Sequence, residues 1–216
     1  MSEMPDFLPF ADREEAGRML AGRLEKLELG GAEVLGLARG GVQVARPVAE
    51  RVGGRLDVLV TRKIGYPPQP ELGVGAIAEG GEPVYDAGLM RKLGLEEEDL
   101  AEVAAAEREE VRRRVRAYRG DRPPPEMAGR DVVIVDDGLA TGVTARAALR
   151  MARSRGPARL VLAVPVGAGD TVESMLQEAD EVVVLATPVR FMAVGQWYDR
   201  FDQLSDEDVL DILGRR

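Results

Sequence analysis

Two adjacent carboxylates, Asp136 and Asp137, follow the apolar run Val132–Val135 and precede a loop of small residues that leads into a predicted helix. An apolar run of this kind is typical of a strand buried on both faces of a parallel sheet. Residues 141–144 bring backbone N–H groups to the helix start, where the helix dipole favours an anion such as phosphate. Because paired carboxylates accept hydrogen bonds from hydroxyls, the segment favours binding of a phosphorylated sugar.

The same segment, residues 132–144, resembles the 5-phosphoribosyl-1-pyrophosphate (PRPP) signature of the type I phosphoribosyltransferases. That signature is a hydrophobic strand, two acids, two residues and a small-Thr-Gly-x-Thr loop. The resemblance implies that the acids bind the ribose hydroxyls and, through water or through PRPP oxygens, the Mg²⁺ that accompanies PRPP. It also implies that the loop binds the 5-phosphate. The implied PRPP-binding residues of this segment are Asp136, Asp137, Gly138, Leu139, Ala140, Thr141, Gly142, Val143 and Thr144.

Two positions of the signature need comment. Gly138 departs from the family pattern, which usually has a branched apolar residue there; the extra backbone freedom costs roughly 0.5–1 kcal/mol relative to Ala. Ala140 stands where the 6-oxopurine enzymes of the family carry an Asp, so the resemblance disfavours hypoxanthine or guanine as the acceptor. The alternative interpretation is an ordinary strand-to-helix turn, which requires the strand, the paired acids and the loop to coincide by chance.

Arg39, Gly40 and Gly41 follow another predicted strand. Ligands of open α/β sheets bind beyond the carboxyl ends of the strands. A cation beside two glycines lets a guanidinium and backbone N–H groups converge on a polyanion, although a tight strand-to-helix turn has the same pattern. The tripeptide resembles the family's pyrophosphate loop, which implies PRPP binding by these three residues. In relatives this loop often holds a non-proline cis peptide.

Residues 61–81 are rich in Gly and Pro and predict a long loop with an extended stretch near residues 74–78. Loops longer than about 12–15 residues are uncommon in compact domains and are often functional. The segment resembles the family's flexible catalytic loop, which carries Arg-Lys; the alternative is an ordinary exposed hairpin loop. The catalytic residues that the resemblance implies are Asp136, Asp137, Arg62 and Lys63.

Residues 186–204 follow the last predicted strand and contain the only Trp of the chain. They loosely resemble the hood that covers the acceptor base in some family members. Stacking of a base on an aromatic side chain is worth ~1–3 kcal/mol. The acceptor-pocket residues implied are Phe191, Val194, Trp197 and Tyr198. The alternative is that these side chains belong to the core.

Hydrophobic periodicity predicts alternating strands and helices, and therefore a mostly parallel, open α/β sheet flanked by helices, as in the type I phosphoribosyltransferase fold. Predicted strands cover residues 34–37, 56–60, 132–135, 160–166 and 182–185. Predicted helices cover residues 12–29 and 42–51, a segment from the 141–144 loop to about 156, a segment from about 170, and 206–213 with Ser205 as N-cap. The charged segment 86–119 predicts a helical insertion within one domain of residues 1–216, with one packed stripe on a solvated surface.

Composition restricts the class of protein. The net charge of −9 argues against nucleic-acid binding, which needs a basic surface. No apolar stretch reaches the ~18 residues of a membrane span. Residues 1–6 lack the pattern of a secretory signal, so a cytoplasmic location is expected. Because the chain has no Cys and no His, proton transfer is left to carboxylates, Lys, Tyr or water.

The resemblance implies a phosphoribosyltransferase that joins the phosphoribosyl group of PRPP to a small heterocyclic acceptor, with Mg²⁺ as cofactor and a place in nucleotide metabolism. A second hypothesis is a regulator on the same fold that senses PRPP or a nucleotide without turnover. Retention of Arg39, Arg62 and Lys63 favours the enzyme, because such regulators often lose catalytic-loop residues. The acceptor, the proton acceptor and any homo-oligomer are left open.

Overall fold

The structure is a computed structural model that describes residues 9–215. Residues 1–6, on which the expected cytoplasmic location depends, lie outside this range. Between residues 9 and 215, no helix combines the length and the apolar character needed to cross a bilayer.

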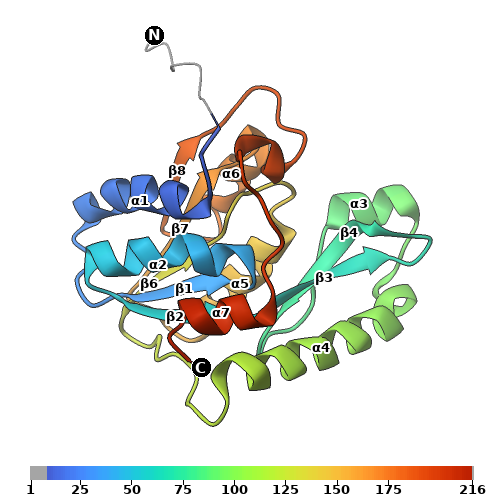
Figure 1. Cartoon of the computed structure of the whole chain (residues 1–216). Coiled ribbons are helices and arrows are strands. Elements are labelled where there is room, and N and C mark those ends of the chain that lie inside the picture. Colours follow the sequence, from blue (N-terminus) through green and yellow to red (C-terminus); the bar gives the residue numbers. More distant parts are fainter. Residues whose placement is uncertain (1–8, 216) are drawn as a thin grey trace.

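Five strands form the central sheet, in the order β2-β1-β6-β7-β8 (Figure 1). Their bounds are β1 Glu33–Leu37, β2 Arg55–Leu59, β6 Asp131–Val135, β7 Arg159–Val166 and β8 Glu181–Ala186. Every pairing between neighbouring strands of this sheet is parallel, which confirms the predicted α/β architecture. Each of the five predicted strands lies within one residue of its observed bounds.

Helices cover both faces of this sheet, which explains why its strands are apolar on both sides (Figure 1). Helices α1 (Arg13–Leu24) and α2 (Gly40–Val52) pack on one face, against alternate strand residues such as Val133. Helix α5 (Val143–Ser154) packs on the other face, against Val132 and Ile134. The remaining short elements here are the 3₁₀ helix η1 (Glu25–Leu27), which ends the helix predicted over 12–29, and α6 (Gly169–Met175) between β7 and β8.

A hairpin replaces most of the loop predicted over residues 61–81, so the prediction of a loop is wrong, whereas the extended stretch predicted near residues 74–78 lies within a strand. Strands β3 (Thr61–Tyr66) and β4 (Gln69–Ala78) pair antiparallel, and β5 (Val84–Tyr85) joins β4. The glycines that suggested a loop permit close backbone approach instead; a Cβ on Gly75 would lie 2.8 Å from the carbonyl oxygen of Val84. We call β3, β4 and β5, with the helices that pack on them, the arm.

The insertion over residues 86–119 is helical, as predicted, but it is interrupted. Helix α3 (Ala87–Leu93) ends at Gly94, which adopts a φ of 65°. A 3₁₀ helix, η2 (Glu97–Leu100), then leads into α4 (Ala101–Arg119). An apolar cluster joins these helices to the hairpin; its buried members are Ile64, Val74, Met90, Leu100 and Ala104. The arm projects from the edge of the sheet, with α4 running below it in Figure 1.

The last segment of the chain returns across the sheet edge. It contains the 3₁₀ helix η3 (Val194–Trp197) and ends in α7 (Asp206–Ile212), which packs against α2 and α4. The Ser205 hydroxyl accepts a hydrogen bond from the Asp208 N–H at 3.1 Å, which confirms the predicted N-cap.

Because β1 and α2 approach closely at Gly36, a methyl group added there should have a large effect on the free energy of unfolding. A Cβ on Gly36 would lie 2.5 Å from the Val42 Cα, which is backbone and has no room to yield. We expect Gly36→Ala to lower the free energy of unfolding in urea by about 1–3 kcal/mol, as overpacking does. Gly22→Ala is the control, because a Cβ there meets nothing within 4 Å; in the helix interior it should stabilise by about 0.5–1 kcal/mol. Equal stability of Gly36→Ala and the parent would contradict the packing.

Candidate functional site

The acid pair and the Arg39–Gly41 loop meet at the carboxyl edge of the sheet. Strands β1 and β6 are parallel neighbours, with Gly36 opposite Val135, so the segments that leave them are adjacent. A Cβ on Gly40 would overlap the Asp137 carboxylate, and one on Gly41 would lie 2.5 Å from the carbonyl oxygen of Val135. Both glycines are therefore needed for two loops to approach this closely.

A buried guanidinium faces the acid pair. Arg13, at the first turn of α1, donates from Nε to Asp137 Oδ2 at 2.8 Å, and the two side chains are 8% and 16% exposed. The same guanidinium donates to the Asp202 carbonyl at 2.8 Å and lies 3.8 Å from the centroid of the Phe201 ring. Sequence reasoning missed Arg13, because its partner is 124 positions away and no local pattern marks it.

The surroundings disfavour ionisation of both acids. Burial, followed by the charge of Asp137, raises the pKa of Asp136 well above its ordinary value. Burial also raises the pKa of Asp137, against the opposing effect of Arg13. One Asp136 oxygen accepts the Asp137 N–H at 2.9 Å, which gives the carboxylate limited compensation. The pair is thus suited to accept hydroxyl donors or a cation.

The loop after the acids has free backbone donors. Within residues 9–215, the N–H groups of residues 140–144 donate no hydrogen bond to the protein. The loop is nevertheless fixed, because the Leu139 N–H donates to the Val166 carbonyl at 2.9 Å. Gly142 caps α5 with a φ of 73° and no side-chain bond, and a Cβ there would lie 2.6 Å from Thr171 Cγ2. A fixed loop with several unused donors at a helix start is suited to bind a phosphate group, and we call residues 140–144 the phosphate cradle.

The segment predicted as a hood contacts the acid loop from the other side. A Cβ on Gly138 would lie 2.8 Å from Val194 Cγ2, so the unusual glycine makes room for Val194. The Tyr198 hydroxyl donates to the Asp137 carbonyl oxygen, and the Tyr198 ring stacks on Phe201 at 5.0 Å between centroids. Tyr198 is buried, so here it supports the acid loop rather than offering a ring face.

Two other aromatic residues of the hood, Phe191 and Trp197, are more accessible than Tyr198. Phe191 and Trp197 are partly buried and pack on the same aromatic cluster. The indole Nε1 of Trp197 is buried without a hydrogen-bond partner among residues 9–215. An acceptor pocket formed by Phe191, Val194 and Trp197 stays a prediction.

Arg62 and Lys63 lie on opposite faces of the β3–β4 hairpin. Arg62 pairs across the strands with Ile77, which packs near α4, and its guanidinium contacts Glu107 at 2.6 Å. Lys63 pairs with Ala76, which belongs to the apolar cluster of α5. Since paired residues point to the same face, Lys63 lies on the face of the hairpin that is turned toward α5.

Each of the three predicted cations is engaged by the chain itself. Lys63 Nζ donates to the Glu71 carbonyl at 2.8 Å. Arg39 Nη1 lies 3.8 Å from Asp206 Oδ1, and the Ala38–Arg39 peptide is cis, as the resemblance implies. A diphosphate would have to draw these side chains away from their present partners.

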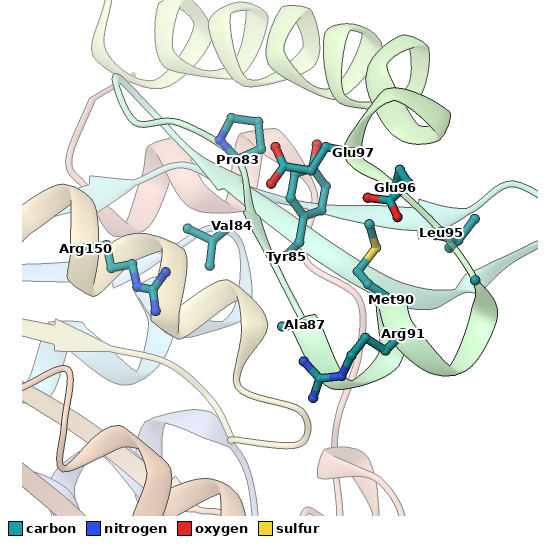
Figure 2. A pocket seen from close by; sticks show the side chains of 11 residues that line it. Pro83, Val84, Tyr85, Ala87, Met90, Arg91, Leu95, Glu96, Glu97 and Arg150 are labelled. Carbon is teal, nitrogen blue, oxygen red and sulfur yellow. The ribbon is translucent and has the colours of Figure 1, made fainter.

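A cavity of about 600 Å³ lies apart from this edge, between α3, β5 and the middle of α5. Figure 2 shows Arg91 and Arg150 extending toward it, the first from α3 and the second from α5. None of the site residues predicted from the sequence lines it. The volume of this cavity therefore gives no indication of where the acid pair and the phosphate cradle lie.

Comparison with known proteins agrees with the sequence signature. A sequence model described as "Phosphoribosyl transferase domain" matches residues 14–186. Two Mycobacterium tuberculosis proteins, "Putative phosphoribosyl transferase MT0597" (strain CDC 1551 / Oshkosh) and "Putative phosphoribosyl transferase Rv0571c" (strain ATCC 25618 / H37Rv), are each 49% identical over 209 residues. These matches cover 95% of this chain and 46% of either relative, so the chain spans about half the length of those curated relatives.

Two further similarities differ in extent. The crystal structure of the protein TT1426 from Thermus thermophilus is 46% identical and has a TM-score of 0.80, covering 95% of this chain and 98% of that one. A uracil phosphoribosyltransferase of Clostridium beijerinckii (strain ATCC 51743 / NCIMB 8052) is 41% identical over 59 residues, which is 27% of this chain and 28% of that protein.

The raised pKa of Asp136 predicts that this acid destabilises the empty protein. Below about pH 4 the carboxyl is protonated in both the folded and the unfolded chain, so it carries no penalty. As pH rises through the higher folded-state pKa, ionisation costs folding free energy. Asp136→Asn should therefore unfold at a higher temperature than the parent at pH 7.5, and the difference should vanish toward pH 4.

Asp180→Asn is the control of opposite sign for this measurement. The hydrogen bond from Arg153 is the main cause that lowers the pKa of Asp180, so its ionised form stabilises the fold at neutral pH. Differential scanning calorimetry should show a lower midpoint for Asp180→Asn at pH 7.5. A midpoint of Asp136→Asn at or below that of the parent throughout this pH range would contradict the destabilising role.

Proposed function

This chain belongs to the phosphoribosyl transferase family, and from that premise we propose that it transfers the 5-phosphoribosyl group of PRPP to a nitrogen atom of a small heterocyclic acceptor and releases pyrophosphate. One observation carries the proposal. The acid pair, the open N–H groups of residues 140–144 and the Gly40–Gly41 backbone lie together at the carboxyl edge of a parallel sheet. Such an edge is where ligands of open α/β sheets bind.

In this proposal the cradle positions the sugar. The free N–H groups of residues 140–144, with the Thr141 and Thr144 hydroxyls, hold the 5-phosphate. Asp136 and Asp137 accept hydrogen bonds from the ribose hydroxyls. Because Arg13 holds Asp137 Oδ2, the Asp137 carboxylate has a fixed orientation before the substrate arrives.

The donor set fits a magnesium ion that binds together with PRPP. Mg²⁺ commonly takes one or two protein carboxylates and completes its coordination with water and substrate phosphates. Asp136 and Asp137 supply two such carboxylates, and no group of three or more acidic residues, His or Cys suited to a metal occurs within residues 9–215. When bound, the ion would offset negative charge on the diphosphate.

The reaction forms one bond and breaks one. The acceptor nitrogen donates its electron pair to the anomeric carbon, and the bond from that carbon to the diphosphate oxygen breaks, with its electrons leaving on pyrophosphate. The transition state is cationic at the sugar. Lys63 and the Arg39–Gly41 loop stabilise the charge that develops on the leaving group. The proton lost by the acceptor passes to a carboxylate, Lys, Tyr or water, because the chain has no His.

The residue at one sequence position restricts which bases we expect as acceptors. Ala140, which is exposed, stands where the resemblance places an Asp in the 6-oxopurine enzymes. Without a carboxylate there, a 6-oxopurine has no partner for its ring N–H. We therefore infer that hypoxanthine and guanine are poor acceptors.

A second candidate is a PRPP or nucleotide sensor without turnover. It is favoured by the engagement of Arg39, Arg62 and Lys63 with carboxyl or carbonyl groups of the chain. In a sensor these contacts would persist when PRPP binds, whereas in the enzyme at least Lys63 must be released toward the leaving group.

Pyrophosphate release from Mg²⁺-PRPP with a panel of bases separates the two candidates. The enzyme predicts turnover with at least one base. Saturable PRPP binding without turnover by any base would favour the sensor, and absence of PRPP binding would contradict both the enzyme and a PRPP sensor.

Lys63→Ala tests the proposed role of the arm once an acceptor is found. We expect kcat to fall about 100-fold or more while PRPP affinity changes only a few-fold, because the charge acts mainly on the transition state. Lys92→Ala removes the same charge from an exposed position on α3 and should leave both parameters unchanged. A Lys63→Ala variant with the parent's kcat would contradict the assignment.

A further inference from the structure

We propose that a second cavity, whose lining does not include the acid pair, binds an anion that carries several phosphate groups. It has a volume of about 440 Å³ and lies between α4, the segment after it, and the end of α5. We call it the arginine cavity; the residues that line it are Glu79, Gly80, Val111, Arg112, Val115, Arg116, Arg119, Gly120, Arg122, Pro124 and Arg155. It shares no residue with the candidate active site.

The charge of this cavity opposes that of the molecule. Five arginines and one carboxylate line it, in a chain whose net charge is −9. Arg116, Arg122 and Arg155 form no ion pair with any of residues 9–215, although most arginines of the structure do. These three guanidinium groups are exposed, so water screens part of their mutual repulsion, and an anion bound between them would remove the rest.

The floor of the cavity is a buried ion pair. Arg119 is 6% exposed; it contacts Glu79 Oε1 through Nη1 at 2.8 Å and donates from Nη2 to the Val58 carbonyl at 3.0 Å. Its Nε is buried without a hydrogen-bond partner among the described residues. The other Glu79 oxygen accepts the Val60 N–H at 3.3 Å, so this carboxylate is neutralised internally. Glu79 therefore leaves no negative charge to offset the three arginines without an ion pair.

The shape and chemistry of the walls indicate the kind of ligand. Guanidinium groups bind phosphate through paired N–H donors, and several of them favour a polyphosphate over a single phosphate. Val111, Val115 and Pro124 add an apolar wall that suits a flat organic body. The volume lies within the roughly 300–1,000 Å³ typical of small-molecule sites. A nucleoside polyphosphate combines both features.

The cavity lies at the base of the arm, so a ligand bound there would contact the start of the hairpin that carries Lys63. Glu79 follows β4 directly, and its N–H donates to the Val60 carbonyl at 2.9 Å. Val60 in turn precedes β3, the strand that carries Lys63. An anion against the floor therefore lies beside the two residues from which the hairpin emerges.

Isothermal titration calorimetry with ATP tests the site. The cavity variant Arg116→Gln/Arg122→Gln/Arg155→Gln should bind ATP at least ten-fold more weakly than the parent. The control variant Arg18→Gln/Arg46→Gln/Arg51→Gln removes the same charge from exposed ion pairs on α1 and α2 and should stay within about three-fold of the parent. Equal affinity of the cavity variant and the parent, equal weakening of both variants, or no binding by the parent would overturn the proposal.

Hydrogen exchange of the unmodified protein gives a readout that does not depend on a variant. Bound ATP should protect the backbone N–H groups of residues 79–80 and 111–122. Protection confined to residues 138–144 would place ATP in the phosphate cradle and would overturn the proposal, even if PRPP turnover had been established.

Discussion

Two carboxylates stand side by side at the end of β6 with little access to water, and the buried guanidinium of Arg13 contacts one of them, Asp137, at 2.8 Å. Much of the site is arranged around this contact. Arg13 begins α1, while the Asp202 carbonyl and the Phe201 ring that fix its guanidinium come from the other end of the chain. Tyr198 joins the same C-terminal segment to the Asp137 backbone. The start of α1 and the C-terminal segment 198–202 thus together hold the loop that carries the acid pair.

This arrangement favours the binding of a ligand at the expense of the stability of the ligand-free fold. Burial raises the pKa of both acids, so the empty site carries a free-energy cost at neutral pH that Arg13 only partly offsets. A ligand that brings hydroxyl donors and a cation would remove that cost. The same site offers unused N–H groups in the cradle. Disfavoured charges and unsatisfied donors at one sheet edge are common where a protein binds a ligand.

The parts that were predictable from the sequence depend on local patterns. Val132–Val135 is apolar because both faces of β6 are covered, and the acids and glycines follow at fixed spacing. The strand, the acid pair and the cradle could therefore be predicted from one continuous stretch of sequence. The role of Arg13 could not be predicted, because it depends on a partner that is distant in the sequence. The hairpin of the arm was missed for another reason: Gly65, Gly73 and Gly75 weaken a strand signal, yet here they allow close approach in a hairpin that packs on the predicted helices. The partners of Arg62 and Lys63 were likewise set by the register of that hairpin.

The central claim is that the acid pair is held in an environment that opposes its charge until the phosphorylated sugar and its cation bind. Proton release on binding is the most direct measure of this. Calorimetric titration with Mg²⁺-PRPP between pH 5 and 7, in buffers of different ionisation enthalpy, gives the number of protons exchanged. The account predicts that the parent releases protons in excess of those released by Asp136→Asn, because binding favours the ionised carboxylate. Saturable binding with equal proton release by the two proteins throughout this range would contradict it.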